Sequence, residues 1–142
     1  MSVKHLLCLC GFILISFCSF GQQQNNTIWV VDYVKIKNGK TAETLYYYNQ
    51  NWKRYREEAL RKGHIKSYKI LMAETGDQQN FDLMLMTEFA DSTQLSKVEE
   101  HFQPIIKDLN PDGPKLLNDV KPAEFRETVY NKRFYQLAPF LP

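Results

Sequence analysis

The sequence predicts an α+β fold in which two helices pack on a four-stranded antiparallel sheet. The predicted elements follow the order strand, helix, strand, strand, helix, strand, which is the βαββαβ pattern. The strands carry large apolar side chains on both faces, unlike a sheet that is buried on one face only. A chain of 142 residues, 44% of them apolar, fits one packed domain, which we place at residues 27–137 between a polar tether (22–26) and a short tail (138–142).

Residues 1–21 have the features of a secretory signal peptide. Lys4 precedes an apolar run from Leu6 to Phe20, and the small residues Ser19 and Gly21 mark a cleavage position. The run is too short to cross a bilayer, which takes roughly 20 residues as a helix. We therefore expect no stable membrane span and an exported protein, periplasmic or secreted.

All three cysteines lie in this leader, at Cys8, Cys10 and Cys18. Cleavage after Gly21 leaves a chain without disulfides or thiolate ligands, and we predict no metal site. The alternative is a bacterial lipoprotein lipidated on Cys18. The bulky Phe17 argues against it, because that motif has a small residue before the cysteine.

The first predicted strand, residues 27–37, is rich in β-branched and aromatic residues. After a turn at Asn38-Gly39, Thr41 can cap a helix of about 20 residues, the best-defined element of the chain. Its apolar residues recur at helical spacing and form one stripe: Leu45, Tyr48, Trp52, Tyr55 and Ala59.

Two further strands, residues 64–74 and 81–89, are joined by polar turn-forming residues and predict an antiparallel hairpin. A second amphipathic helix follows, and Pro104 within it predicts a kink or break near Phe102. After a loop rich in turn-forming residues, residues 125–137 predict the last strand.

This order of elements is typical of the ferredoxin-like fold, in which both helices cover the same face of the sheet. The other face would then expose large apolar side chains, each at a cost of about 1.5–3 kcal/mol. They are Trp29, Val31, Tyr33, Met84 and Met86. We therefore expect a second copy of the chain to cover this face, so that the protein is a homodimer.

From residue 28 to residue 137 the chain resembles the dimeric α+β barrel superfamily, which includes antibiotic-biosynthesis-monooxygenase-like, stress-responsive and haem-degrading proteins. The resemblance is one of pattern: the order of elements, the long aromatic first helix and the two-faced strands. It implies a barrel of two sheets with the helices outside. It also implies that ligands bind inside the barrel or between sheet and helices, and it allows a haem-using or cofactor-independent oxygenase.

Two residues are candidates for catalysis, and each has a simpler interpretation. Asp32 shares a strand face with valines, and a buried carboxylate in such a place can act as an acid or base. The interpretation we favour is a residue near the sheet edge bonded to a lysine or tyrosine. Haem-degrading members of the superfamily use a histidine on a helix as iron ligand, and His101 lies on the second helix. A partly exposed surface histidine is the interpretation we favour, and the cofactor, haem included, stays undetermined.

A second set of candidates is aromatic and rich in methionine, and we expect it to face the barrel. Such side chains can hold a flat apolar ligand or fill the dimer core, and core is their more frequent role. The set comprises Trp29, Tyr33, Tyr68, Met72, Met84 and Met86.

Composition and motifs limit the possible functions. A formal net charge of +2 excludes nucleic acid as an expected partner, and no phosphate-binding loop or hydrolase motif occurs. The leading hypothesis is an exported homodimeric barrel protein that binds a small apolar molecule, and whether it is an enzyme stays open. The alternatives are the oxygenase and a non-catalytic interaction module with a solid barrel core. The partner of that module would meet an outer surface formed by Tyr46, Tyr47, Lys53, Arg54 and Arg56.

Overall fold

The computed structural model describes residues 26–74 and 80–137. The predicted signal peptide, most of the tether and the predicted tail lie outside the described residues. The sheet has the order β2-β3-β1-β4, and each strand is antiparallel to its neighbours. Its strands are β1 (Ile28–Ile36), β2 (Ser67–Met72), β3 (Leu83–Phe89) and β4 (Arg126–Tyr135).

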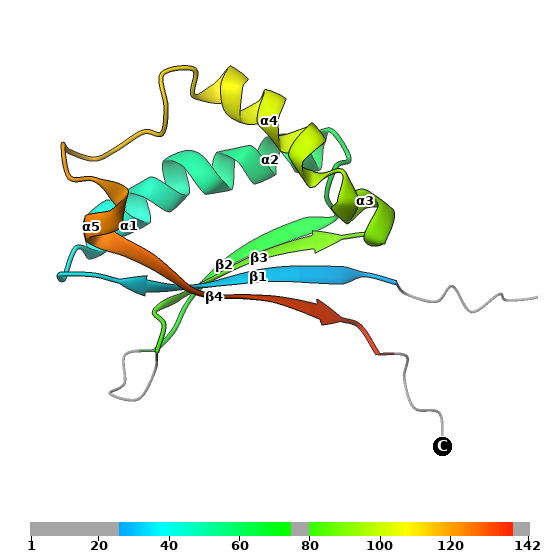
Figure 1. Cartoon of the computed structure of the whole chain (residues 1–142), viewed down its shortest axis with the longest axis horizontal. Helices are drawn as coiled ribbons and strands as arrows, with labels where there is room; N and C mark the ends of the chain where they lie inside the picture. The colour runs from blue at the N-terminus through cyan, green and yellow to red at the C-terminus, as the bar shows by residue number, and fades with distance from the viewer. Residues whose placement is uncertain (1–25, 75–79, 138–142) are drawn as a thin grey trace, which may run out of the picture.

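The helices lie on one side of this sheet, as Figure 1 shows, and the ferredoxin-like α+β prediction is confirmed. Along the chain they are α1 (Thr41–Tyr47), η1 (Tyr48–Lys53), α2 (Arg54–Arg61), α3 (Ser92–Ser96), α4 (Val98–Leu109) and α5 (Pro122–Phe125). None of the helices in the described part of the chain is long and apolar enough to span a membrane.

The first helix runs without interruption from α1 through η1 to α2, as the apolar stripe predicts. Its middle, η1, is a π-helical segment, and Thr41 is the first helical residue instead of the cap. Asn51 in η1 is buried, and its amide group accepts from the backbone N–H of Lys115 and donates to the Lys115 carbonyl, both at 2.8 Å. Asn110 donates to the Asn51 side chain at 2.6 Å, so the loop after α4 is tied to this segment.

The second predicted helix is broken, but not at the predicted place. The break falls at Lys97, between α3 and α4, and α4 continues through Phe102 and Pro104. Pro104 is exposed, so the carbonyl that loses its helical partner can bond to water and the helix tolerates the ring. Asp91 caps α3 by accepting a hydrogen bond from the backbone N–H of Gln94 at 2.8 Å.

The core between helices and sheet consists of two clusters. One joins the first helix to the sheet through Val34, Tyr48, Trp52, Leu83 and Leu85. The other joins α2 and α4 to β3 through Ala59, Ile65, Phe89, Phe102 and Ile105. Apolar spacing predicted the members from the first helix, Tyr48, Trp52 and Ala59, because an amphipathic helix buries one stripe.

Strand register assigns the sheet residues to two faces. Leu83, Leu85 and Phe89 of β3 are buried under the helices, while Met84 and Met86 alternate with them on the opposite face. We call that opposite face the open face, because no helix covers it. Register also places on it Trp29, Val31 and Tyr33 of β1, Leu71 of β2, and Tyr130 and Phe134 of β4.

Replacing Leu85 by alanine tests the helix-side core. Leu85 is 2% exposed, and its truncation leaves a cavity under the first helix. We expect Leu85→Ala to lower the free energy of unfolding by about 2–5 kcal/mol in urea denaturation. Leu60→Ala is the matched control, since Leu60 is 43% exposed and its truncation is expected to cost less than about 0.5 kcal/mol. Equal effects of the two substitutions would contradict this packing.

Candidate functional site

The edge strand β4 is not covered by the helix layer. Among the residues that the structure describes, none from β4 belongs to either core cluster. Its helix-facing residues at positions 128, 131, 133 and 135 are exposed. The helix-facing side of β4 is therefore accessible beside the first helix, and polar side chains collect there.

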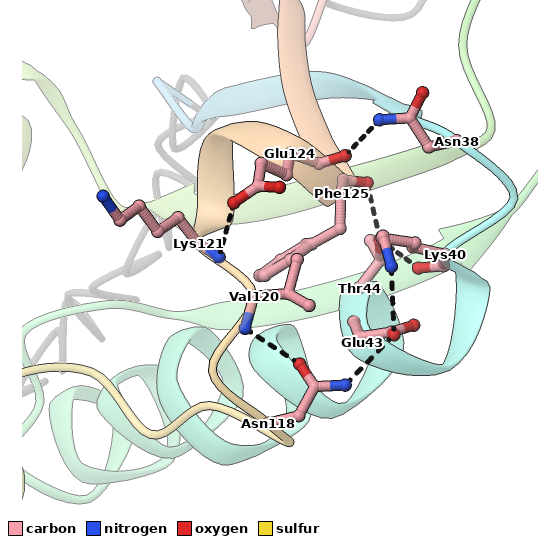
Figure 2. A network of polar contacts seen from close by, with 9 residues as sticks. All are labelled: Asn38, Lys40, Glu43, Thr44, Asn118, Val120, Lys121, Glu124 and Phe125. Carbon is pink, nitrogen blue, oxygen red and sulfur yellow. Dashed lines mark hydrogen bonds and ion pairs between the residues drawn. The ribbon is translucent and has the colours of Figure 1, made fainter.

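A hydrogen-bonded joint fixes the start of β4 against α1, as Figure 2 shows. Asn38 donates through Nδ2 to the Glu124 carbonyl at 2.8 Å, and the Thr44 hydroxyl lies 2.9 Å from the Phe125 carbonyl oxygen. Asn118 donates to Glu43 at 3.2 Å on the outer side of the same joint. Phe125 is buried, so the next residue of the chain, Arg126, is placed beside the first helix.

Arg126 is held by two tyrosines. Its guanidinium lies 4.5 Å from the ring centre of Tyr47 and donates to the hydroxyls of Tyr47 and Tyr48 at 3.2 and 3.4 Å. Its Nε is buried and has no hydrogen-bond partner among the described residues. Burial raises the pKa of Tyr48 to about 12, and the nearby Arg126 opposes that rise. Tyr48 is therefore a neutral phenol at neutral pH.

Asp32 lies on the helix-facing side of β1, as the sequence predicts, but the expected surroundings were wrong. β1 is an interior strand, and the partner is neither lysine nor tyrosine. Asn131 of β4, directly opposite, donates through Nδ2 to Asp32 Oδ1 at 2.5 Å. Asp32 also acts electrostatically on Tyr48 and Arg56 of the first helix.

Arg56 of α2 lies under the helix layer instead of on its outer surface. The guanidinium carbon is 4.3 Å from the Trp52 ring centre and 4.7 Å from that of Phe102, and Nε is 3.4 Å from the Thr87 hydroxyl oxygen. Burial lowers the pKa of Arg56 to about 10, while the Asp32 carboxylate opposes this shift, so the group stays charged at neutral pH. In the described part of the chain no carboxylate lies within 4.0 Å of Arg56.

These side chains form one connected group, which we call the polar cluster. Hydrogen bonds, ring contacts or electrostatic interactions link its members: Asp32, Tyr48, Arg56, Thr87, Arg126 and Asn131. The Trp52 indole N–H at its side is buried and has no acceptor among the described residues. Sequence reasoning found Asp32 but missed the two arginines. The position of Arg56 could have been predicted, because its i, i+4, i+8 spacing from Tyr48 and Trp52 puts all three on the same face of the helix.

His101 belongs to a different place. Its ring stacks on His64 at the end of α2, with ring centres 3.8 Å apart and planes 13° apart, and its Nδ1 is buried without a partner in the described structure. This contact packs the segment after α2 against α4. The residues that the structure describes contain no group of three or more His, Cys, Asp or Glu able to hold a metal ion.

The predicted barrel-facing set is divided between the two faces. Trp29, Tyr33, Met84 and Met86 lie on the open face, as predicted. Tyr68 and Met72 do not: they pair with Thr87 and Leu83, so their side chains point to the helix side. Tyr68 packs edge-on against Trp52, with ring centres 6.0 Å apart. The prediction put these two side chains of β2 on the opposite face of the sheet. Successive side chains of a strand point to opposite faces, so an error of one residue in the alternation moves every side chain to the wrong face.

The outer surface of the first helix carries a shallow hollow. Its lining residues are Tyr46, Asn49, Gln50, Lys53, Arg54 and Glu57. Tyr47 and Arg56, which we expected on this surface, lie instead in the polar cluster or against it. The basic outer patch is thus smaller than the sequence suggested.

Comparisons with known proteins found likeness in fold only. No protein-family model matches the chain, and the search of curated proteins gave no match. A conserved protein from Methanosarcina mazei Go1 is 18% identical with a TM-score of 0.48, covering 81% of this chain and 97% of its own. A dimeric protein of unknown function and ferredoxin-like fold from Bacteroides fragilis NCTC 9343 is 11% identical with a TM-score of 0.43, covering 78% of this chain and 97% of its own. At these values neither structure supports an argument about function.

The stacked histidines predict a pH dependence of stability. Burial lowers the pKa of His64 below its ordinary 6.5, and His101 and Lys62 lower it further, while Glu100 opposes them. The unfolded chain then binds a proton more readily than the folded one, so stability falls as the pH drops through this range. We expect the free energy of unfolding in urea to decrease from about pH 7 to about pH 5, less steeply in His64→Gln. Lys107→Gln on α4 is the control, and an unchanged slope in His64→Gln would contradict this assignment.

Proposed function

We propose that this protein is an exported homodimer that binds a small aromatic molecule at the polar cluster of each protomer. The observation that carries the binding proposal is the buried Trp52 indole N–H, which has no acceptor among the described residues and lies against the Arg56 guanidinium. Export follows from the signal-peptide features of residues 1–21.

The dimer proposal rests on the open face. Leu71, Tyr130 and Phe134 are 46%, 43% and 45% exposed on it, and half-buried Trp29 and Met86 lie between them. Leu71, Met84, Tyr33 and Tyr130 form one apolar and aromatic row across the four strands, and in the next row Lys69 and Lys132 flank Met86 and Val31. An apolar row that crosses a whole sheet is unusual on the surface of a monomer. A second copy of the same face would bury it, because an isologous two-fold contact pairs one patch with itself.

Light scattering coupled to gel filtration tests the dimer. We expect the mass of two chains for the wild type and of one chain for Met86→Lys, because the substitution would place a charge in the buried contact. Leu60→Lys makes the same kind of change on the exposed surface of α2 and should leave the dimer intact. A wild-type protein that stays monomeric at micromolar concentration would overturn the dimer proposal.

The binding proposal rests on the chemistry of the polar cluster. The Arg56 guanidinium is stacked between the Trp52 and Phe102 rings, and the buried Trp52 indole N–H has no hydrogen-bond partner among the described residues. Leaving a desolvated donor unpaired costs free energy, and a ligand acceptor would recover it. Tyr48, Trp52 and Phe102 supply aromatic surface next to these polar groups, which is the usual make-up of a small-molecule site.

The chain has two tryptophans, and they report on the two candidate binding regions. Trp52 contacts the polar cluster and Trp29 lies on the open face. We expect nitrobenzene, a quencher of indole fluorescence, to quench the Trp29→Phe variant saturably, because only Trp52 remains there. The Trp52→Phe variant, which keeps Trp29, should show only linear collisional quenching. Saturable quenching of Trp29 alone would move the binding site to the barrel interior and overturn this proposal.

A further inference from the structure

We infer that Arg126, Tyr47 and Tyr48 form a binding site for a carboxylate at the end of the polar cluster where β4 begins. In this arrangement the ligand carboxylate is the counter-ion of the Arg126 guanidinium and accepts hydrogen bonds from the two phenol hydroxyls. The inference rests on the proposed function, because it names the chemical class that the polar cluster binds.

Arg126 is a partly buried cation without a counter-ion in the described structure. Among the described residues no carboxylate oxygen lies within 4.0 Å of its nitrogens, and its Nε is buried without a hydrogen-bond partner. Asp32 acts electrostatically on the neighbouring Tyr48, but its carboxylate is bonded to Asn131 at 2.5 Å. A desolvated charge without a partner costs free energy, so a bound anion would stabilise this arrangement.

The two tyrosines add hydroxyl donors beside the guanidinium. Arginine has no acceptor atom, so in its contacts of 3.2 Å with Tyr47 and 3.4 Å with Tyr48 each hydroxyl oxygen accepts. Each hydroxyl proton is therefore directed elsewhere, and neither hydroxyl donates to an acceptor among the described residues. Burial raises the pKa of Tyr48 to about 12, so its proton is retained at neutral pH. Guanidinium and hydroxyls together offer donors and a positive charge, which favours an anionic acceptor.

Ring packing holds these donors in place before a ligand binds. The guanidinium carbon is 4.5 Å from the Tyr47 ring centre, which is 5.4 Å from the Tyr48 ring centre and 5.6 Å from that of Phe125. Phe125 is anchored in turn, since its carbonyl oxygen lies 2.9 Å from the Thr44 hydroxyl in the joint of Figure 2. A guanidinium that is held in this way loses little conformational freedom on binding, and its planar shape matches a carboxylate. Arg126 and Tyr47 stay partly exposed beside the uncovered strand β4, so a ligand can reach them from solvent.

Two probes of similar shape test the requirement for charge. We expect equilibrium dialysis to show that 4-nitrobenzoate binds at least about 10-fold more tightly than 4-nitrobenzamide, which is uncharged. The benzoate should also shift the Arg126 Nε–H signal in nitrogen–proton correlation spectra, which is identified by its absence from Arg126→Lys. Equal affinity for the two probes, or an Arg126 signal that does not move, overturns the carboxylate inference.

Nitrobenzene separates this failure from a failure of the proposed function. If nitrobenzene quenches Trp52 saturably in the Trp29→Phe protein but the benzoate has no advantage over the amide, the aromatic site stands and the carboxylate inference is wrong. If neither nitrobenzene nor the two charged and uncharged probes bind saturably, the proposed function fails as well.

Arg126→Gln is the decisive variant because it removes the charge and keeps a polar side chain. We expect it to weaken 4-nitrobenzoate at least about 10-fold and to leave 4-nitrobenzamide within about 2-fold. Tyr48→Phe keeps the ring and removes one hydroxyl, so it should weaken the benzoate about 3-fold to 10-fold. Circular dichroism and the melting temperature check that both variants are folded.

Arg133→Gln is the matched control, since Arg133 is an exposed arginine on the same side of the same strand. It removes an equal charge away from the two tyrosines and should change the affinity for neither probe. If Arg133→Gln weakens 4-nitrobenzoate as much as Arg126→Gln does, the general charge of β4 is responsible and the inferred site is wrong.

Discussion

The helices form one layer on one face of the sheet, but the sheet carries apolar side chains on both faces. The rest of the structure depends on how the second apolar face is covered. The helices bury Leu83, Leu85 and Phe89 of β3, while Met84 and Met86 alternate with them on the open face. Burying both faces is worth several kcal/mol, and the chain has no third layer within its described residues. A second copy of the chain is the simplest cover for the open face.

On the helix-facing side of the sheet, the helix layer does not extend over the edge strand β4. The sheet there carries Asn131 instead of an aliphatic residue, and Asn131 donates to the Asp32 carboxylate at 2.5 Å. The joint between α1 and α5 fixes the start of β4 and with it Arg126, so the polar cluster is built on a rigid frame.

The sequence was sufficient for the order of elements, because helical and strand periodicities are local properties. It was not sufficient for the strand register, and Tyr68 and Met72 were predicted on the wrong face of the sheet. The face of each β2 side chain depends on how β2 pairs with β3, which the sequence of β2 alone does not determine. The break at Lys97 was missed because Pro104 was the stronger local signal. Asp32 was found, whereas its partners Asn131 and Arg56 come from distant segments that only the folded sheet brings together.

We infer that the open faces of two copies meet, and nuclear magnetic resonance can detect the contacts between copies. In a mixed dimer of labelled and unlabelled chains, isotope-filtered nuclear Overhauser spectra report only contacts between copies. We expect cross-peaks from the methyl groups of Met84 and Met86 to the rings of Trp29 and Tyr33 of the other copy. Intermolecular cross-peaks confined to helix residues, or none at all at millimolar concentration, would contradict it.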